Sequence, residues 1–317
     1  MNKRTRKQFA LNQSPLGTVQ GKAFTLIELL VVIAIIGILS ALIVVGMSST
    51  TQKATIAKAQ VFSNSLRNSL MGNLVSEWRL DENANPSANR TPDTWGTNTG
   101  ILGDGATATT FPTLVSTESS CVSGKCFGFD GGDYVNCGNA STLNFLAPIT
   151  ISAWIKTSIG SSQMIVGKEI DATHKDWQFE IFPTGLLGFE GSAFHRIGTT
   201  NLADGNWKQV VTTMTAAGST NVRLYVNGIE EVYTQTGSTG DLGSNLALAF
   251  IGARYTTPVN HFNGLIDEVR IFNAAMPTSQ IQQNYFIGLN KLFAKNQITQ
   301  SDYQQRLADL ATSFAKH

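Results

Sequence analysis

A period-two pattern runs through Ile149-Thr-Ile-Ser-Ala-Trp-Ile-Lys156, where Ile and Ala alternate with Thr, Ser, Trp and Lys. Successive side chains of a β-strand point to opposite faces, so this stretch predicts a strand with one buried face. Similar patterns predict further strands at residues 207–214, 222–226, 229–233, 246–251 and 265–272. Asn227-Gly228 is a strong signal for a type I′ hairpin. Short strands separated by turns, without helical patterns between them, indicate an antiparallel, all-β sandwich.

An uncharged run extends from Leu29 to Met47, before this body. As a helix it would span about 28 Å, close to the hydrocarbon thickness of a bilayer. Residues 1–23 carry five Lys or Arg and no acidic residue, and the next cation after the run is Lys53. The positive-inside rule places this basic leader in the cytoplasm. A single-pass membrane protein with an exported carboxy-terminal body is therefore predicted.

Helical patterns flank the predicted sandwich. The first helix is expected to continue past the bilayer, because four apolar residues recur every four positions, at Phe62, Leu66, Leu70 and Leu74. A helical start at Pro277 and an N-cap at Thr299 before Asp302 predict a pair of helices at the end of the chain. We expect this pair to cap the sandwich; the alternative is a module that docks a partner. The predicted parts are a leader (1–23), a membrane and assembly helix (24–75), a head (76–276) and a helix-turn-helix cap (277–317).

Composition and acidic pairs limit the possible functions. The 317 residues include 23 Lys+Arg and 22 Asp+Glu, a net charge of +1, so no basic surplus exists for direct nucleic-acid binding. A retaining glycosidase needs two carboxylates about 5 Å apart, and adjacent residues on a strand point to opposite faces. Three acidic pairs of the body are adjacent residues, at Asp81-Glu82, Glu230-Glu231 and Asp267-Glu268. The body is predicted to be non-enzymatic.

The three cysteines are Cys121, Cys126 and Cys137. In an exported domain, cysteines can oxidise. A Cys121–Cys126 disulfide would close a turn of four residues that include a Gly. A Cys126–Cys137 bond across two strands is the alternative, and either pairing leaves one thiol over.

The amino terminus resembles that of type IV pilins and pseudopilins. The string Ala23-Phe-Thr-Leu-Ile-Glu-Leu-Leu-Val-Val-Ile-Ala-Ile-Ile-Gly-Ile-Leu39 carries the resemblance. It implies that a prepilin peptidase and N-methyltransferase cuts between Ala23 and Phe24 and methylates Phe24. Glu28 then corresponds to the glutamate at the fifth mature position, with a role in assembly with other pilin-like subunits. That family nearly always has Gly before the cut, where this chain has Ala23.

The body resembles the concanavalin A-like, laminin-G-like jelly rolls. Four strings carry this resemblance in family order, at residues 127–135, 149–155, 224–228 and 262–272. The resemblance implies a jelly-roll head that binds a glycan or a surface protein, and it makes a calcium ion at Asp130 and Asp267 possible. The Glu-x-Asp-x-Glu strand of the hydrolase branch is absent from this sequence.

These observations predict a pilin-like or pseudopilin-like filament subunit with a binding head. The alternative is a membrane-tethered exported lectin that does not polymerise.

Overall fold

The computed structural model describes residues 71–81, 89–170, 175–233, 235–236, 240, 242–243, 247–254 and 260–314. The chain divides into two units, residues 1–55 and 56–317, and all described residues belong to the second. The predicted positions for cleavage, methylation, assembly and the ends of the uncharged run lie outside the described residues: Ala23, Phe24, Glu28, Leu29 and Met47. Within the described part of the chain, no helix has the length and apolar character needed to cross a membrane.

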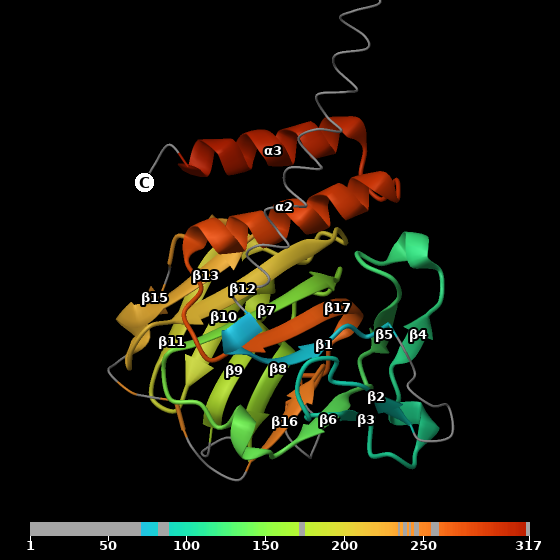
Figure 1. The fold of residues 1–317 in the computed structure, drawn as a ribbon, viewed down its shortest axis with the longest axis vertical. Coiled ribbons are helices and arrows are strands. Elements are labelled where there is room, and N and C mark those ends of the chain that lie inside the picture. Colours follow the sequence, from blue (N-terminus) through green and yellow to red (C-terminus); the bar gives the residue numbers. More distant parts are fainter. Residues whose placement is uncertain are drawn as a thin grey trace, which may run out of the picture. The chain divides into compact units, whose positions relative to one another are not determined.

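Two antiparallel sheets form the body of the head (Figure 1). We call the first sheet A, with strand order β14-β13-β12-β7-β17-β5-β4 and with β1 paired to β17. Its strands are β1 (Leu74–Trp78), β4 (Thr113–Val115), β5 (Cys126–Asp130), β7 (Ile149–Lys156), β12 (Lys208–Met214), β13 (Val222–Val226), β14 (Ile229–Glu230) and β17 (Asn263–Phe272).

The second sheet, sheet B, has the order β15-β11-β10-β9-β8-β16-β6-β3-β2. Its strands are β2 (Arg90–Thr91), β3 (Gly100–Leu102), β6 (Val135–Gly138), β8 (Gln163–Glu169), β9 (Lys175–Phe182), β10 (Leu186–Gly191), β11 (His195–Asn201), β15 (Gln235–Thr236) and β16 (Leu248–Ile251). Short 3₁₀ turns occupy Met71–Asn73, Ala108–Thr110, Glu118–Ser120, Ser141–Leu143, Pro183–Gly185 and Ser219–Asn221.

The strand prediction that decided the fold class is confirmed. Strand β7 spans Ile149–Lys156, and its Ile and Ala side chains are at most 1% exposed within the core. This core includes side chains from both sheets, among them Phe127 of β5 and Phe179 of β9. The hairpin prediction is also confirmed, because Asn227 (φ 52°) and Gly228 (φ 76°) both have the positive φ of a type I′ turn. Strand β14 is shorter than predicted and ends at Glu230.

The predicted extension of the first helix to residue 75 is wrong. Leu74 opens β1, and it pairs with Phe272 of β17, after a 3₁₀ turn at Met71–Asn73. The every-fourth-residue pattern therefore does not reach Leu74 as a helix. Pairing with a strand almost two hundred residues away decides this segment, and a local pattern carries no information on that partner.

The helices α2 (Thr278–Ala294) and α3 (Gln300–Phe314) cover the outer face of sheet A (Figure 1). Trp154 points away from the core on β7 and stacks on Tyr285 of α2, with ring centroids 5.8 Å apart. A Cβ at Gly288 would lie 2.1 Å from a ring atom of Trp154, so glycine allows α2 to approach the sheet this closely. The prediction of a cap on the sandwich is thereby confirmed.

Both predicted helix starts are confirmed. Pro277 is the N-cap residue of α2. The Thr299 hydroxyl accepts a hydrogen bond from the backbone N–H of Asp302 at 3.1 Å, as an N-cap side chain does. Between the two helices, Asn296 has a positive φ of 56°, a conformation that Asn tolerates better than most residues.

Candidate functional site

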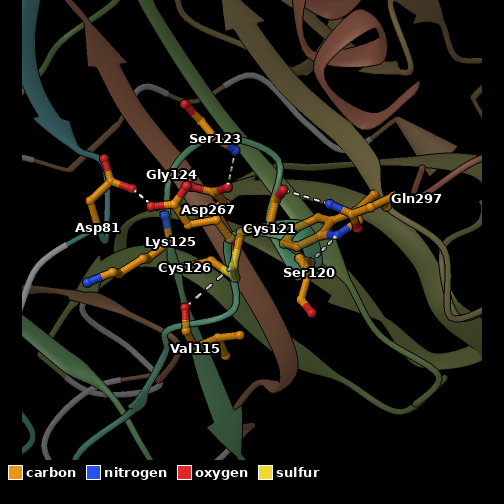
Figure 2. Close-up of a disulfide and its surroundings, with 12 residues drawn as sticks. Asp81, Val115, Ser120, Cys121, Ser123, Gly124, Lys125, Cys126, Asp267 and Gln297 are labelled. Carbon is orange, nitrogen blue, oxygen red and sulfur yellow. Dashed lines mark hydrogen bonds between the residues drawn. A yellow bond between two sulfur atoms is a disulfide. The ribbon is translucent and has the colours of Figure 1, made fainter. Parts of the chain in front are cut away.

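A disulfide joins Cys121 to Cys126 and closes the loop between them (Figure 2). The first of the two predicted pairings is therefore the one that forms. Cys137 is the free thiol and lies buried in the core, so the alternative Cys126–Cys137 pairing is not made. We refer to residues 121–126 as the disulfide loop.

The disulfide loop holds the turn between α2 and α3. The Lys295 ammonium donates hydrogen bonds to the carbonyl oxygens of Glu118 at 2.8 Å and of Cys121 at 3.0 Å. The side-chain amide of Gln297 donates to the same Cys121 oxygen at 2.6 Å (Figure 2). One turn earlier on α2, the Lys291 ammonium donates to the Ser123 hydroxyl at 2.8 Å. The disulfide loop thus anchors the helical cap to the head.

Two carboxylates support the disulfide loop from the side of the sheet (Figure 2). Asp267 of β17 accepts the backbone N–H of Ser123 at 2.9 Å, and Asp81 accepts that of Lys125 at 2.7 Å. Burial raises the pKa of Asp267 well above its ordinary value, and the neighbouring Glu268 carboxylate raises it further. Asp267 therefore has a structural task in this site.

A β-bulge follows Asp267 in β17. The register with β7 shifts between Asp267 and Arg270, and Glu268 takes a positive φ of 51°. Arg270 contacts both Glu268 and Glu77, the latter at 2.8 Å. Burial alone would raise the pKa of Glu77, but the charge of Arg270 and a hydrogen bond from Thr94 outweigh it and hold the pKa at about 2. The bulge is thus fixed by a buried network of opposite charges.

The two residues suggested for calcium are not brought together. Asp130 pairs with Asn263 at the exposed end of β5, and Asp267 lies four residues further along β17. At about 3.3 Å per residue, the two positions are about 13 Å apart along the strand. Asp267 is fully buried, whereas Asp130 is exposed. Within the described part of the chain, no group of three or more His, Cys, Asp or Glu side chains is placed to hold a metal ion.

Asp130 instead lies beside a second carboxyl group, that of Asp133, which accepts the Asp130 backbone N–H at 3.0 Å. Burial, with a smaller effect of the Asp130 charge, raises the pKa of Asp133 from 3.8 to about 6. The folded chain therefore binds this proton more tightly than the unfolded chain. The stability that the folded protein gains from protonation of Asp133 is fully present below about pH 4 and is lost as the pH rises through about 6.

Replacing Asp133 by Asn should remove this dependence, because an amide does not titrate. We expect the melting temperature of Asp133→Asn relative to the unchanged protein to increase as the pH rises from about 4 to about 6.5. Thermal melting followed by circular dichroism across this range measures the difference. A difference that is constant with pH would show that Asp133 ionises in the folded chain as freely as in the unfolded one.

Glu230 and Glu231 serve the fold, and Glu82 lies outside the described residues. Glu230 forms an ion pair with Arg223, and Glu231 accepts the backbone N–H groups of Thr199 and Thr200, both at 2.8 Å. These oxygen atoms are therefore already in use within the head.

Sheet B contains a buried charged group that the sequence reasoning missed. Lys168 of β8 is fully buried and forms an ion pair with Asp176 of β9. Next to it, Glu169 pairs with Arg254 at 2.7 Å. Asp176, the partner of Lys168, lies on β9. The sequence contains a signal for that strand, because Trp177, Phe179 and Ile181 alternate with polar residues.

Comparisons with known proteins identify two regions of the chain. The profile of the prokaryotic N-terminal methylation motif matches residues 21–44. The profile of the concanavalin A-like lectin/glucanases superfamily matches residues 129–282. No similar sequence is found among curated proteins.

Solved structures with a similar fold belong to larger carbohydrate-active enzymes and toxins. Domain 4 of the extracellular arabinanase AbnA of Geobacillus stearothermophilus, solved with arabinotriose, is 20% identical over 66% of this chain and 97% of that domain, with a TM-score of 0.46. The Trypanosoma rangeli sialidase is 15% identical over 68% of this chain and 32% of its own, with a TM-score of 0.48. The binding domain of botulinum neurotoxin serotype D is 16% identical over 70% of this chain and 52% of its own, with a TM-score of 0.48.

The match thus spans nearly all of the arabinanase domain, about half of the neurotoxin domain and a third of the sialidase. Of the described elements, the superfamily match covers the strands from β6 to β17 and the start of α2, whereas β1 to β4 lie before it. The chain combines a prokaryotic N-terminal methylation motif at residues 21–44 with a concanavalin A-like, laminin-G-like domain at residues 129–282.

Proposed function

We propose that this chain is the precursor of a pilin-like or pseudopilin-like filament subunit whose head binds a glycan or a protein on a surface. The match of the methylation motif to residues 21–44 carries the proposal. This segment contains Ala23, Phe24 and Glu28, and it includes the start of the uncharged run that begins at Leu29. Cleavage, methylation, membrane insertion and assembly would therefore use one continuous stretch.

The order of events follows from the chemistry of this stretch. A prepilin peptidase would cut between Ala23 and Phe24 on the cytoplasmic side and methylate Phe24. The run from Leu29 to Met47 would hold the subunit in the membrane until it joins other pilin-like subunits. The disulfide Cys121–Cys126 supports export of the head, because such bonds persist in oxidising compartments outside the cytoplasm.

The head is proposed to bind rather than to catalyse. Its superfamily contains both lectins and glucanases, so the fold leaves the choice open. The described acidic residues support binding, because Glu230, Glu231, Asp267 and Glu268 all have partners within the fold. These carboxylates thus have roles in stabilising the fold, which favours binding over catalysis.

One observation favours a second candidate, a membrane-tethered lectin that never polymerises. Ala23 stands where related precursors nearly always have Gly, and a slowly cleaved precursor would stay in the membrane. The two candidates differ in where the chain accumulates. Shearing cells, collecting the filaments and quantifying this chain in the filament and membrane fractions separates them. Co-purification with filaments is expected, whereas retention of the entire pool in the membrane fraction would support the tethered lectin.

A further inference from the structure

The connection between β2 and β3, residues 92–99, is a tightly organised loop. A single carboxylate, that of Asp93, accepts backbone N–H groups from Glu77 at 2.9 Å, Trp95 at 3.1 Å, Gly96 at 2.8 Å and Asn98 at 3.0 Å. Three of these hydrogen bonds fix the backbone of the loop, and the fourth, from Glu77, ties the loop to β1.

Further contacts fasten the loop to the sandwich. Asn98 is 4% exposed, and its side-chain N–H donates to the Ser76 hydroxyl at 2.6 Å. Its backbone carbonyl oxygen accepts a hydrogen bond from the Trp78 indole N–H at 2.8 Å. A Cβ added at Gly96 would lie 2.3 Å from the carbonyl oxygen of Val75, so the loop rests directly on β1. The loop is therefore rigid before any ligand arrives, which lowers the entropy lost on binding.

Trp95 projects from this rigid loop with 41% of its surface exposed. The other four tryptophans of the chain, Trp78, Trp154, Trp177 and Trp207, are all 3% exposed or less. Within the described part of the chain, Trp95 is the only aromatic residue among the exposed large hydrophobics. The hydrogen bonds of Asp93 and Asn98 hold the backbone that carries the indole at this surface position.

The loop that carries Trp95 is rich in hydroxyl groups and has no free charge among its own residues. Thr94, Thr97 and Thr99 are exposed around it, and Asp93 is the only ionisable residue between positions 92 and 99. Both Asp93 oxygens already accept backbone N–H groups. The absence of any Lys or Arg in the loop disfavours an anionic ligand such as a nucleic acid or an acidic lipid. Trp95 is the only exposed large hydrophobic residue within the loop itself, so the loop offers a single aromatic face.

We propose that the loop of residues 92–99 is a saccharide-binding site for a neutral glycan. The indole face of Trp95 stacks on the C–H face of one sugar ring, because the ring electrons of an aromatic attract weakly positive hydrogen atoms. The hydroxyls of Thr97 and Thr99 exchange hydrogen bonds with the sugar hydroxyls, whereas the Thr94 hydroxyl donates to Glu77 at 2.6 Å and is left to accept. This inference rests on the proposed function, and it gives the binding head a defined site.

The site is tested with the purified full-length chain in detergent and four neutral polysaccharides, laminarin, arabinan, galactan and mannan, with heparin as an anionic comparison. We expect at least one neutral polysaccharide to bind and Trp95→Ala to weaken its affinity tenfold or more. Trp95→Phe should keep part of the affinity, since phenylalanine retains an aromatic face. Ile159→Ala is the matched control, because Ile159 is an apolar residue with the same exposed fraction, 41%, in the segment that follows β7.

Three outcomes would overturn the site: no binding of any neutral polysaccharide, equal binding by Trp95→Ala, or an equal loss in Ile159→Ala. Incorporation of Trp95→Ala into filaments is measured in parallel. Normal incorporation without any Trp95-dependent binding would remove the saccharide site and leave the filament role standing. Trp95-dependent binding by a chain that never enters filaments would support the saccharide site and remove the filament role.

Discussion

Replacing Glu28 by Ala should leave the chain inserted in the membrane and cleaved, but lower its incorporation into filaments by roughly tenfold or more. In the apolar core of a filament, Glu28 of one subunit is expected to pair with the methylated, still cationic amine of Phe24 in a neighbour. Removing one partner of a buried ion pair costs about 3–5 kcal/mol, because the other charge is left unpaired. The pair would thus set the axial register of subunits more than it adds net stability.

Two further variants separate charge from size. Glu28→Gln keeps the length of the side chain and loses the charge, so it should resemble Glu28→Ala. Glu28→Asp keeps the charge and should retain part of the incorporation. The filament and membrane fractions are compared by quantitative immunoblotting, with cleavage followed by the change in mass. Normal incorporation of Glu28→Ala would contradict the assembly role.

Removing the disulfide should detach the helical cap. Serine at both Cys121 and Cys126 abolishes the closed loop, whose entropic contribution to stability is about 2 kcal/mol for a loop this short. A domain of this size would then melt about 4–8 °C lower. The loss should be concentrated at the cap, because the Cys121 carbonyl oxygen accepts hydrogen bonds from both Lys295 and Gln297. Trypsin should therefore cut faster after Lys291 and Lys295.

Cys137→Ala is the matched control for this experiment. Cys137 is a buried free thiol in the core between the sheets, so its replacement lowers stability without touching the disulfide loop. The control should melt at a lower temperature and keep the unchanged rate of cleavage in α2. If the double serine variant is also cleaved by trypsin at the unchanged rate, the disulfide loop does not anchor the cap.

Local patterns were sufficient where neighbouring residues decide the structure. The alternation in Ile149–Lys156 predicted β7, Asn227-Gly228 predicted the hairpin, and Thr299 predicted the start of α3. In each case the preference lies within a few residues, as a face, a pair of positive φ angles or a capping hydroxyl. The Cys121–Cys126 pairing remained one of two possibilities, because spacing alone does not select a disulfide.

Long-range partners decided the features that could not be predicted. Leu74 continues a helical pattern in the sequence but joins β1, because β17 offers it a strand edge. Lys168 is fully buried, which depends on Asp176 across the β8–β9 pair. Asp267 lies in a string typical of the superfamily, yet its use is set by the disulfide loop, which arrives from a segment some 140 residues earlier. Trp95 is likewise exposed because Asp93 and Asn98 fix its loop.

The central claim is that the chain is a processed filament subunit, and the amino terminus of the chain found in sheared filaments tests it most directly. Mass spectrometry should find a mature chain that begins at Phe24 and carries one added methyl group. The membrane fraction should contain the same mature terminus together with precursor that still carries its leader before Phe24. Filaments that lack this chain, or that contain it only with its uncut leader, would contradict the account.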